Sequence, residues 1–504
     1  MVNRCLVIGI DGATFDIIKP RISEGRLPNM SKLMDEGVYG DLRSTIPHSS
    51  IPAWPSFLTG VNPGKHGVFD FLKRTPGEYI GSVSNSNDLR SPTIYDILSE
   101  NDKTNVTINV TGTFPPKKVK GCLISGFLTP DGADYVYPPI LKNDLESMGY
   151  WVYKDLKGIL DSNQLYNELL SLEERRKDVA LSLMKIFDWE FFMVMIIGTD
   201  TLQHKLWGEN EKIYNYYCEI DRIVGELIEP LDDDVNVIVV SDHGSGPTRK
   251  IFYINKWLQE IGLMNIKPVQ TESTRSQKIR KLQNKKSDSI ATFLGNIGVT
   301  KRRLRSFVKS PLISKIRWLI PSFVTKKYSR LPEDNLAIDW SRTQVALSSF
   351  FGNQSIMMNL WGREPEGIVL PEDYESLRKQ VILQLENIKD PQTGDSIVER
   401  VFTREELYEG PYLDEAPDIV MMLKGRYKAS NSLQADEIIG ELSDDKIKGS
   451  HRQHGIFIAG GPDIESGCIV NNASIYDMMP TILKLMKVDI PKNLDGRVLT
   501  EILR

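Results

Sequence analysis

The sequence predicts an α/β protein with a mostly parallel central sheet flanked by helices, interrupted by a basic helical insertion. Three apolar, β-branched segments support this prediction, and each stops at an aspartate: CLVIGIDG at Asp11, FFMVMIIGTD at Asp200 and VNVIVVSDHG at Asp242. Short apolar runs bounded by glycine and polar turn residues are typical of buried parallel strands. Segments of helical periodicity separate the three runs, and this alternation is the pattern of a parallel α/β sheet.

Residues 1–265 are expected to form the first part of this core. After the strand that ends at Asp11, a helix carries Met30, Leu33 and Met34. A loop rich in serine and proline follows at residues 45–54. The later elements predicted in this half are a strand at 104–110, a long helix at about 162–187 and a helix at about 211–229.

Residues 266–330 interrupt the alternation and are expected to form the basic amphipathic insertion. Between residues 275 and 330 the chain has 16 lysines and arginines and one acidic residue, although the net charge of the whole chain is −5. Residues 331–504 are expected to form the second part of the core. The elements predicted there are strands at 344–350, 354–360 and 455–462 and helices at about 372–387 and 475–486.

The composition is that of an ordinary globular protein, with 40% hydrophobic and 26% charged residues in a chain of 504. No stretch approaches the roughly 18 continuous apolar residues of a transmembrane helix, and the amino terminus lacks the basic and apolar regions of a signal peptide. The four cysteines have no CxxC spacing, which argues against a disulfide framework and fits a reducing compartment. We therefore expect a cytoplasmic protein.

Carboxylates at three strand ends predict a shared metal site. In an open α/β sheet the ligand site lies outside the carboxyl ends of the strands, so Asp11, Asp200 and Asp242 should converge. His243 follows Asp242 directly, and His204 lies one helical turn after Asp200. Carboxylates mixed with imidazoles are the ligand set of Zn²⁺ or Mn²⁺. Two late histidines precede a strand, and either can face the same crevice: His451 and His454.

A hydroxyl beside such a site can act as a nucleophile. Two metal ions about 4 Å apart clamp the attacking and leaving oxygens of a displacement at phosphorus. Ser50 precedes Pro52 at a predicted helix start, where backbone N–H groups favour phosphoryl oxygens. The alternative interpretation is that Ser50 is a plain N-cap.

The motifs together resemble the alkaline phosphatase superfamily, and within it the type I phosphodiesterase/nucleotide pyrophosphatase group and its predicted cytoplasmic phosphohydrolase and phosphomutase relatives. The ordered elements that carry the resemblance are Asp11, Ser50-x-Pro-Ala-Trp, TGVNPGKHG (59–67), Asp200-x-x-x-His204, Ser-Asp242-His243-Gly and Gly-Ser-His451. Further similarity lies at residues 110–130, 359–367 and 475–499. The resemblance spans nearly the whole chain outside the basic insertion and implies an alkaline-phosphatase-like core.

The resemblance implies a metal-dependent phosphohydrolase that cleaves a phosphate mono- or diester. It makes Asp200, His204 and His451 the ligands of one of two divalent cations, Zn²⁺ or Mn²⁺, with His454 as an alternative ligand. The implied ligands of the other cation are Asp11, Asp242, His243 and the oxygen of Ser50, which would form a phosphoserine intermediate. A phosphomutase or phosphotransferase acting on a phosphosugar is the alternative activity. A non-catalytic protein that keeps the fold is a further alternative, against which the complete ligand set argues.

Two departures narrow the substrate class. Nucleotide pyrophosphatases have an asparagine shortly after the His-Gly of this loop, but residues 66–71 (HGVFDF) offer Asp70 instead, which leaves nucleotide diester specificity open. Sulfatases need an arginine at the position of Trp54, so a sulfatase is disfavoured. Three more residues are weaker substrate-binding candidates: Lys65, Asn359 and Arg363. Lys65 can equally be solvated, and for Arg363 a structural ion pair is the favoured alternative.

The insertion offers a further prediction about partners. A basic amphipathic helix pair at 275–330 can cap the crevice, contact an anionic membrane surface as a peripheral protein, or simply dock on the core. We favour a cap that draws an anionic small-molecule or lipid-linked phosphate ester toward the metals. Nucleic-acid binding is not expected, because aromatic residues are sparse among the basic ones.

Overall fold

The computed structural model describes residues 4–75, 77–79, 81–153, 161–267, 338–347, 354–442 and 448–504. The basic stretch at 275–330 lies outside the described residues, so its helices and its partners stay predictions. The chain divides into two compact units, Met1–Leu263 with Gln344–Arg504 and Met264–Thr343. In the described part of the second unit, Ile266 pairs with Ile338 as an isolated antiparallel bridge. The domain boundaries expected from the sequence, at 265 and 330, also stay predictions.

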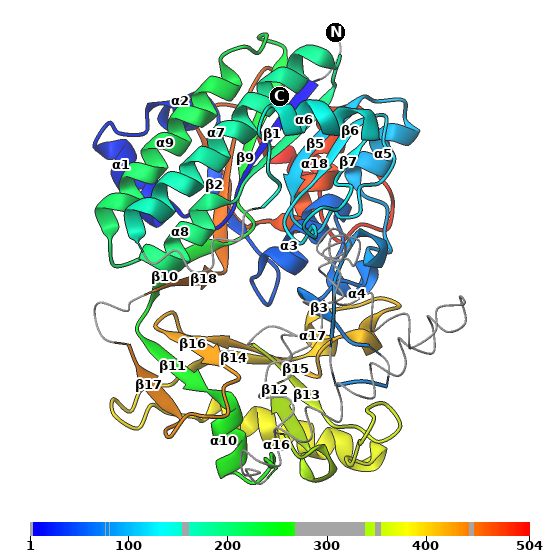
Figure 1. Cartoon of the computed structure of the whole chain (residues 1–504), viewed down its shortest axis with the longest axis vertical. Helices are drawn as coiled ribbons and strands as arrows, with labels where there is room; N and C mark the ends of the chain where they lie inside the picture. Colours follow the sequence, from blue (N-terminus) through cyan, green and yellow to red (C-terminus); the bar gives the residue numbers. More distant parts are fainter. Residues whose placement is uncertain are drawn as a thin grey trace, which may run out of the picture. The chain divides into compact units, whose positions relative to one another are not determined.

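The first unit is built on a ten-stranded, mostly parallel sheet, as predicted (Figure 1). Its centre is the parallel series β9 (Val235–Val240), β1 (Arg4–Ile10), β8 (Phe191–Ile196), β5 (Asn105–Val110) and β6 (Gly121–Ser125). On the β9 side, β19 (His454–Gly460) runs antiparallel between β9 and β2 (Val38–Arg43). The central strands are buried along nearly their whole length, because helices cover both faces.

Alternate residues of the central strands feed two separate cores. Leu6, Ile8 and Ile10 of β1 pack into one hydrophobic cluster, whereas Cys5 and Val7 pack into the other. The first face is covered by α1 (Phe15–Ser23), α2 (Pro28–Glu36), α7 (Ser162–Ile186), α8 (Gly198–Leu206) and α9 (Asn210–Ile228). The second is covered by α3 (Ser50–Thr59), α5 (Ile94–Glu100) and α18 (Met478–Leu485). Because helices cover both faces of the sheet, the ends of its strands are the place for a ligand site.

Smaller sheets complete the unit. An antiparallel four-stranded sheet has the order β12 (Val345–Leu347), β13 (Ser355–Met358), β15 (Ile419–Leu423) and β14 (Val398–Thr403), with α16 (Pro371–Glu386) beside it. β11 (Lys250–Tyr253) pairs with β16 (Tyr427–Ser430) and β17 (Ile439–Glu441). β10 (Gly244–Thr248) pairs with β18 (Lys448–Arg452). The strands predicted near 344 and 354 thus exist, but they form a sheet of their own.

Most predicted elements match the structure, and three differ. The predicted helices at 162–187, 211–229 and 372–387 correspond to α7, α9 and α16. The predicted 191–200 strand is shorter, because it ends at Ile196 and α8 begins at Gly198. The loop predicted at 45–54 ends in α3, and α1, whose interior contains a proline, was not predicted. No helix among the described residues is long and apolar enough to cross a membrane.

Candidate metal centre

The three predicted aspartates meet at one edge of the central sheet. Asp11 directly follows β1, and Asp242 lies two residues beyond β9. Asp200 does not end a strand; it lies in the first turn of α8, four residues beyond β8. Since β1, β8 and β9 are parallel neighbours, their carboxyl ends bring the three carboxylates together.

The first ligand set consists of Asp200, His204 and His451, and all three side chains are partly exposed. Oδ1 of Asp200 lies 3.2 Å from Nε2 of His204 and 3.4 Å from Nε2 of His451. The two Nε2 atoms are 2.9 Å apart. The spacing of four residues in α8 and the pairing of β18 with β10 thus bring groups from distant parts of the chain to one point.

The second ligand set consists of Asp11, Asp242 and His243, and all three side chains are buried. Nε2 of His243 lies 3.5 Å from an Asp11 oxygen and 3.4 Å from an Asp242 oxygen. The Oγ of Ser50 lies 3.3 Å from Asp11 Oδ1 and 3.3 Å from His243 Nε2. This hydroxyl therefore faces the ligand set rather than a backbone N–H.

The two sets are direct neighbours. The rings of His243 and His451 are stacked, with centroids 3.8 Å apart and planes inclined by 19°. Gly12 lies between the sets: its N–H is 3.3 Å from Asp242 Oδ1, and a Cβ there would lie 3.2 Å from Asp200 Oδ1. Its φ of +69° also disfavours any side chain. The sharp turn after β1 therefore requires glycine beside the site.

The hydrogen bonds of the three imidazoles fix which nitrogen faces the site. Nδ1 of His204 is 2.9 Å from the Gly449 carbonyl, and Nδ1 of His243 is 3.0 Å from the Gly244 carbonyl. Nδ1 of His451 is 3.0 Å from the carbonyl of His48. Because a carbonyl only accepts, each neutral ring donates from Nδ1 and turns the lone pair of Nε2 into the site. This arrangement is typical of metal-ligating histidines.

The charges and hydrogen bonds of these residues indicate whether the two ligand sets suit cations. Asp200 Oδ1 and Asp242 Oδ2 are buried oxygens with no hydrogen-bond partner among the described residues. Burial and repulsion by Asp242 and Asp200 raise the pKa of Asp11 well above its usual range. Burial and repulsion by Asp200 raise the pKa of Asp242 to about 7. Acceptors that face acceptors, with no donor between them, need positive charge, so the residues fit divalent cations.

The local backbone at Ser50 differs from a regular helix start. Ile51 has extended backbone angles, so the regular turns of α3 begin after it. The side chain of Ser50 makes contacts with Asp11 and His243 and is buried. These contacts disfavour the interpretation of Ser50 as a plain N-cap.

A buried glutamate that the sequence did not single out holds the start of α8. Glu173 of α7 accepts hydrogen bonds from the N–H groups of Ile197 and Gly198, at 3.2 and 2.8 Å. It also pairs with Arg176 at 2.6 Å, and both side chains are buried. The only sequence signal was a Glu and an Arg on the buried stripe of a predicted helix.

The weaker substrate-binding candidates have protein partners. Lys65 pairs with Asp495 and, at 3.0 Å, with Glu409. Asp70 is buried and accepts a hydrogen bond from the Phe71 N–H. A contact of Lys65 or Asp70 with substrate stays a prediction.

Asn359 and Arg363 are similarly engaged beside the antiparallel sheet. Asn359 is buried, accepts from the Tyr79 hydroxyl at 2.7 Å and donates to the Glu366 carbonyl. Arg363 makes a bidentate pair with the buried Asp418, at 2.6 and 2.7 Å. The structural ion pair favoured from the sequence is therefore present at Arg363.

The remaining histidines lie outside the two ligand sets. His454 is exposed on β19, opposite Arg43 of β2, so the alternative that it replaces His451 is not supported. His66 is buried and lies 3.0 Å from the Ser56 hydroxyl. His48 is buried as well, and burial and the charge of His451 lower its pKa to about 3.

One cation near the first ligand set was not predicted. Lys428 of β16 lies close enough for its charge to act on both Asp200 and His204. Partial burial and Lys448 lower the pKa of the Lys428 amine, whereas Asp200 raises it. No motif marks Lys428 in the sequence, because β16 reaches the site only through its pairing with β11.

Comparison with protein families gives one match that covers more than half of the chain. The sequence model of the family described as type I phosphodiesterase / nucleotide pyrophosphatase matches residues 5–305. The rat protein named ectonucleotide pyrophosphatase/phosphodiesterase family member 1 is 23% identical over 354 residues, which are 67% of this chain and 35% of the rat protein. An uncharacterized pyrophosphatase/phosphodiesterase of Schizosaccharomyces pombe is 24% identical over 260 residues, 48% of this chain and 45% of that protein. The match thus spans less than half the length of these relatives.

Solved structures share the fold. Phosphonoacetate hydrolase from Sinorhizobium meliloti, in complex with phosphonoformate, superposes with a TM-score of 0.60 at 15% identity, covering 97% of this chain and 96% of that one. Murine ectonucleotide pyrophosphatase / phosphodiesterase 5, in complex with AMP, has a TM-score of 0.54 at 12% identity, with both chains fully covered. At these identities the likeness concerns the α/β architecture alone.

Proposed function

Because the chain belongs to the type I phosphodiesterase / nucleotide pyrophosphatase family, we propose that it is a hydrolase of phosphate esters that works at this metal centre. The observation that carries the proposal is the set of three Nε2 lone pairs that face three carboxylates across the sheet edge. The substrate is a phosphate mono- or diester.

Two divalent cations would be held by the two ligand sets. Asp200, His204 and His451 would hold one, and the buried set with the Ser50 oxygen would hold the other. When bound, the cations supply Lewis acidity and offset the negative charge that develops on the phosphoryl oxygens. The mixed carboxylate and imidazole donors favour Zn²⁺, with Mn²⁺ as the alternative.

Ser50 is the proposed nucleophile. Its Oγ attacks phosphorus, the bond from phosphorus to the ester oxygen breaks, and the alcohol leaves with a proton. Water then attacks the phosphoserine, the bond between Oγ and phosphorus breaks, and the serine is restored. The product of this step is phosphate from a monoester and a phosphate monoester from a diester. Asp11 and His243 each have an atom 3.3 Å from Oγ, where they can orient the attacking oxygen and accept a hydrogen bond from its proton.

The test compares Ser50→Ala with Ser49→Ala. Ser49 is the matched control, because it adjoins Ser50 but its side chain makes no capping hydrogen bond to α3. Ser50→Ala should keep its metals and lose turnover of p-nitrophenyl mono- and diesters by roughly 10³-fold or more, whereas Ser49→Ala should keep it. Acid quenching of the parental enzyme should trap a phosphoprotein that Ser50→Ala lacks. A Ser50→Ala protein that works at nearly the parental rate would rule out the serine nucleophile.

Metal content is measured on the same proteins. Elemental analysis after saturation with Zn²⁺ or Mn²⁺ should find about two ions per chain. Asp242→Asn should lower the metal content and the activity together, because it removes charge from the buried set. Fewer than one ion per chain in the saturated parental protein would contradict the metal centre.

A further inference from the structure

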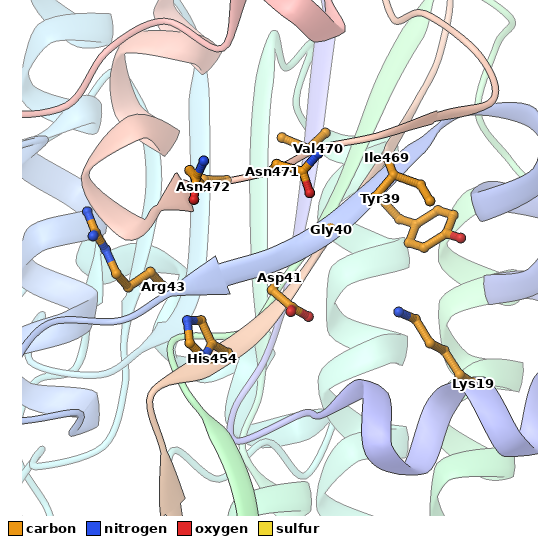
Figure 2. Close-up of a pocket in the computed structure, with 11 residues that line it drawn as sticks. Lys19, Tyr39, Gly40, Asp41, Arg43, His454, Ile469, Val470, Asn471 and Asn472 are labelled. Atoms are coloured by element: carbon orange, nitrogen blue, oxygen red, sulfur yellow. The ribbon is translucent and has the colours of Figure 1, made fainter. Parts of the chain in front are cut away.

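A second polar hollow runs along β2 from Tyr39 to Arg43 (Figure 2). Arg43, at one end of the hollow, is the last residue of β2. Because β19 is antiparallel to both β2 and β9, β2 runs parallel to β9 and ends on the same side. One strand separates β2 from β9, which places the two strand ends about 10 Å apart. The hollow is thus a neighbour of the metal centre and not part of it.

The strand register explains which side chains line the hollow. Tyr39, Asp41 and Arg43 alternate along one face of β2, while the residues between them are buried. His454 of β19 lies directly opposite Arg43. Lys19 of α1 reaches the same face, with its amine 5.4 Å from the ring of Tyr39. Figure 2 shows these side chains spread along β2, with Lys19 and Tyr39 at one end and Arg43 and His454 toward the other.

A break in the edge strand opens the hollow. β20 (Cys468–Ile469) and β21 (Ala473–Ser474) both pair with β2. Val470 still donates its N–H to the Tyr39 carbonyl at 2.8 Å, but residues 471–472 leave the ladder. Asn472 turns the chain with a φ of +61°, a conformation that asparagine tolerates. The bulge places Asn471 and Asn472 on the rim of the hollow.

The polar groups of the hollow are not satisfied by the protein. Among the described residues, no hydrogen bond or ion pair joins five of the lining side chains to the rest of the protein: Asp41, Arg43, His454, Asn471 and Asn472. All five are exposed to solvent, and the charge of Arg43 acts on Asp477. Lys19 has ring contacts only. Exposed polar side chains of this kind bind water, which a polar ligand in the hollow can replace.

We propose that the hollow binds the phosphate monoester of a small polyol. Arg43 supplies positive charge at the end of β2, and its guanidinium can bind a phosphate with two parallel bonds. His454, opposite Arg43, adds a polar nitrogen, and Lys19 adds a second positive charge beside Tyr39, near the start of the strand. Asp41 and the two asparagines offer acceptors and donors for hydroxyl groups. The volume of the hollow, about 250 Å³, suits a small ligand.

The hollow connects to the metal centre through two short segments. Residues 44–49 lead from Arg43 to Ser50, and the Ser44 N–H donates to the Gln453 carbonyl at 2.8 Å, next to His454. Within residues 44–49, the His48 carbonyl accepts a hydrogen bond from Nδ1 of His451. A ligand that bridges Arg43 and His454 would steady both segments, so the site fits an effector of the reaction. The binding proposal itself does not depend on the proposed function.

The test is calorimetric titration of the full-length, metal-loaded Ser50→Ala protein, which should bind a phosphate ester without turning it over, with glycerol 1-phosphate, inorganic phosphate and glycerol. We expect two binding events for glycerol 1-phosphate. Arg43→Gln should weaken one of them about tenfold or more, because a hydrogen bond to a charged group contributes about 1.5–3 kcal/mol. A chelator should remove the other event, which belongs to the metal centre. Glycerol should not bind.

The matched control is Arg400→Gln, since Arg400 is an exposed arginine on β14 whose guanidinium lies 4.4 Å from the ring of Phe402. It should leave both events unchanged. Circular dichroism should show that both variants fold. A single event that the chelator abolishes, or a second event that Arg43→Gln and Asn471→Ala both leave unchanged, would overturn the proposal. Equal affinity for inorganic phosphate and the ester at this site would overturn the polyol assignment. If the chelator removed neither event while Arg43→Gln still weakened one of them, the result would count against the proposed metal centre and the proposal for the hollow would stand.

Discussion

Glu173 gives a sharp test of how the metal centre is held. This carboxylate lies in α7 and contacts no proposed ligand, but it accepts the first N–H groups of α8, which carries Asp200 and His204. Its other partner is Arg176, and both side chains are only 1% exposed. Arg176 in turn donates to the Val152 carbonyl at 3.1 Å.

We expect Glu173→Gln to destabilise the protein by about 3–5 kcal/mol, because it leaves the guanidinium of Arg176 buried without its counter-charge. The amide oxygen of glutamine can still accept from Gly198, so the start of α8 keeps an acceptor. The loss should therefore come from the ion pair. Replacing both partners, in Glu173→Gln/Arg176→Met, should recover at least about 2 kcal/mol, because no buried charge is left unpaired.

Urea unfolding of the metal-free protein, followed by tryptophan fluorescence, measures these differences without the contribution of bound metal. Glu174→Gln is the matched control. Its ion pairs with Lys177 and Arg222 are partly exposed, so it should cost about 1 kcal/mol or less. In the metal-loaded protein, Glu173→Gln should also lower Zn²⁺ affinity by roughly 10–100-fold. If Glu173→Gln cost no more than Glu174→Gln, or if the double variant were the less stable one, the reasoning would fail.

Two further predictions concern charges near the site. Lys428→Gln should raise the KM for a phosphate monoester several-fold and change kcat little, because it removes a cation whose charge reaches the first ligand set; Lys424→Gln, an exposed lysine nearby in sequence, is the kinetic control. Asp418→Asn should cost about 3 kcal/mol in urea unfolding with an unchanged KM, because it removes the charge of the bidentate partner of Arg363 and leaves Glu364, at 2.9 Å, as its counter-charge. A raised KM at unchanged stability would instead support a substrate role for Arg363.

The part of the site that local sequence could predict is the part that short-range geometry builds. A buried strand followed by a turn brings Asp11 and Asp242 to the sheet edge, and helical spacing puts His204 beside Asp200. For Asp200 and His204 the distance along the chain determines the distance in space, whereas for Asp11 and Asp242 local sequence predicts only that each follows a buried strand, and the pairing of β1 with β9 brings them together. The boundary of β8 was misplaced because the strand ends at Ile196 and α8 already begins at Gly198, before Asp200.

Residues that depend on long-range pairing could not be placed in this way. His451 and His454 occur in the same short motif, and only the pairing of β18 with β10 turns His451 toward the candidate metal centre, whereas His454 lies on β19 opposite Arg43. Likewise, the strands near 345 and 355 have ordinary strand composition, and nothing local indicates that they pair with each other, and the second of them with β15, rather than with the central sheet. Strand register is a property of the partner, which a single segment does not encode.

The two ligand sets differ in exposure, and this difference orders the proposed reaction in space. Asp11, Asp242 and His243 are buried, whereas Asp200, His204 and His451 are partly exposed. Ser50 lies against the buried set, so a phosphoryl group must enter past the exposed one. Water and the departing alcohol can then exchange on the exposed side, where Lys428 also lies. This arrangement suits a hydrolase with a covalent intermediate. The attacking oxygen of Ser50 is shielded before substrate binds, and water can reach the phosphoserine from the partly exposed side.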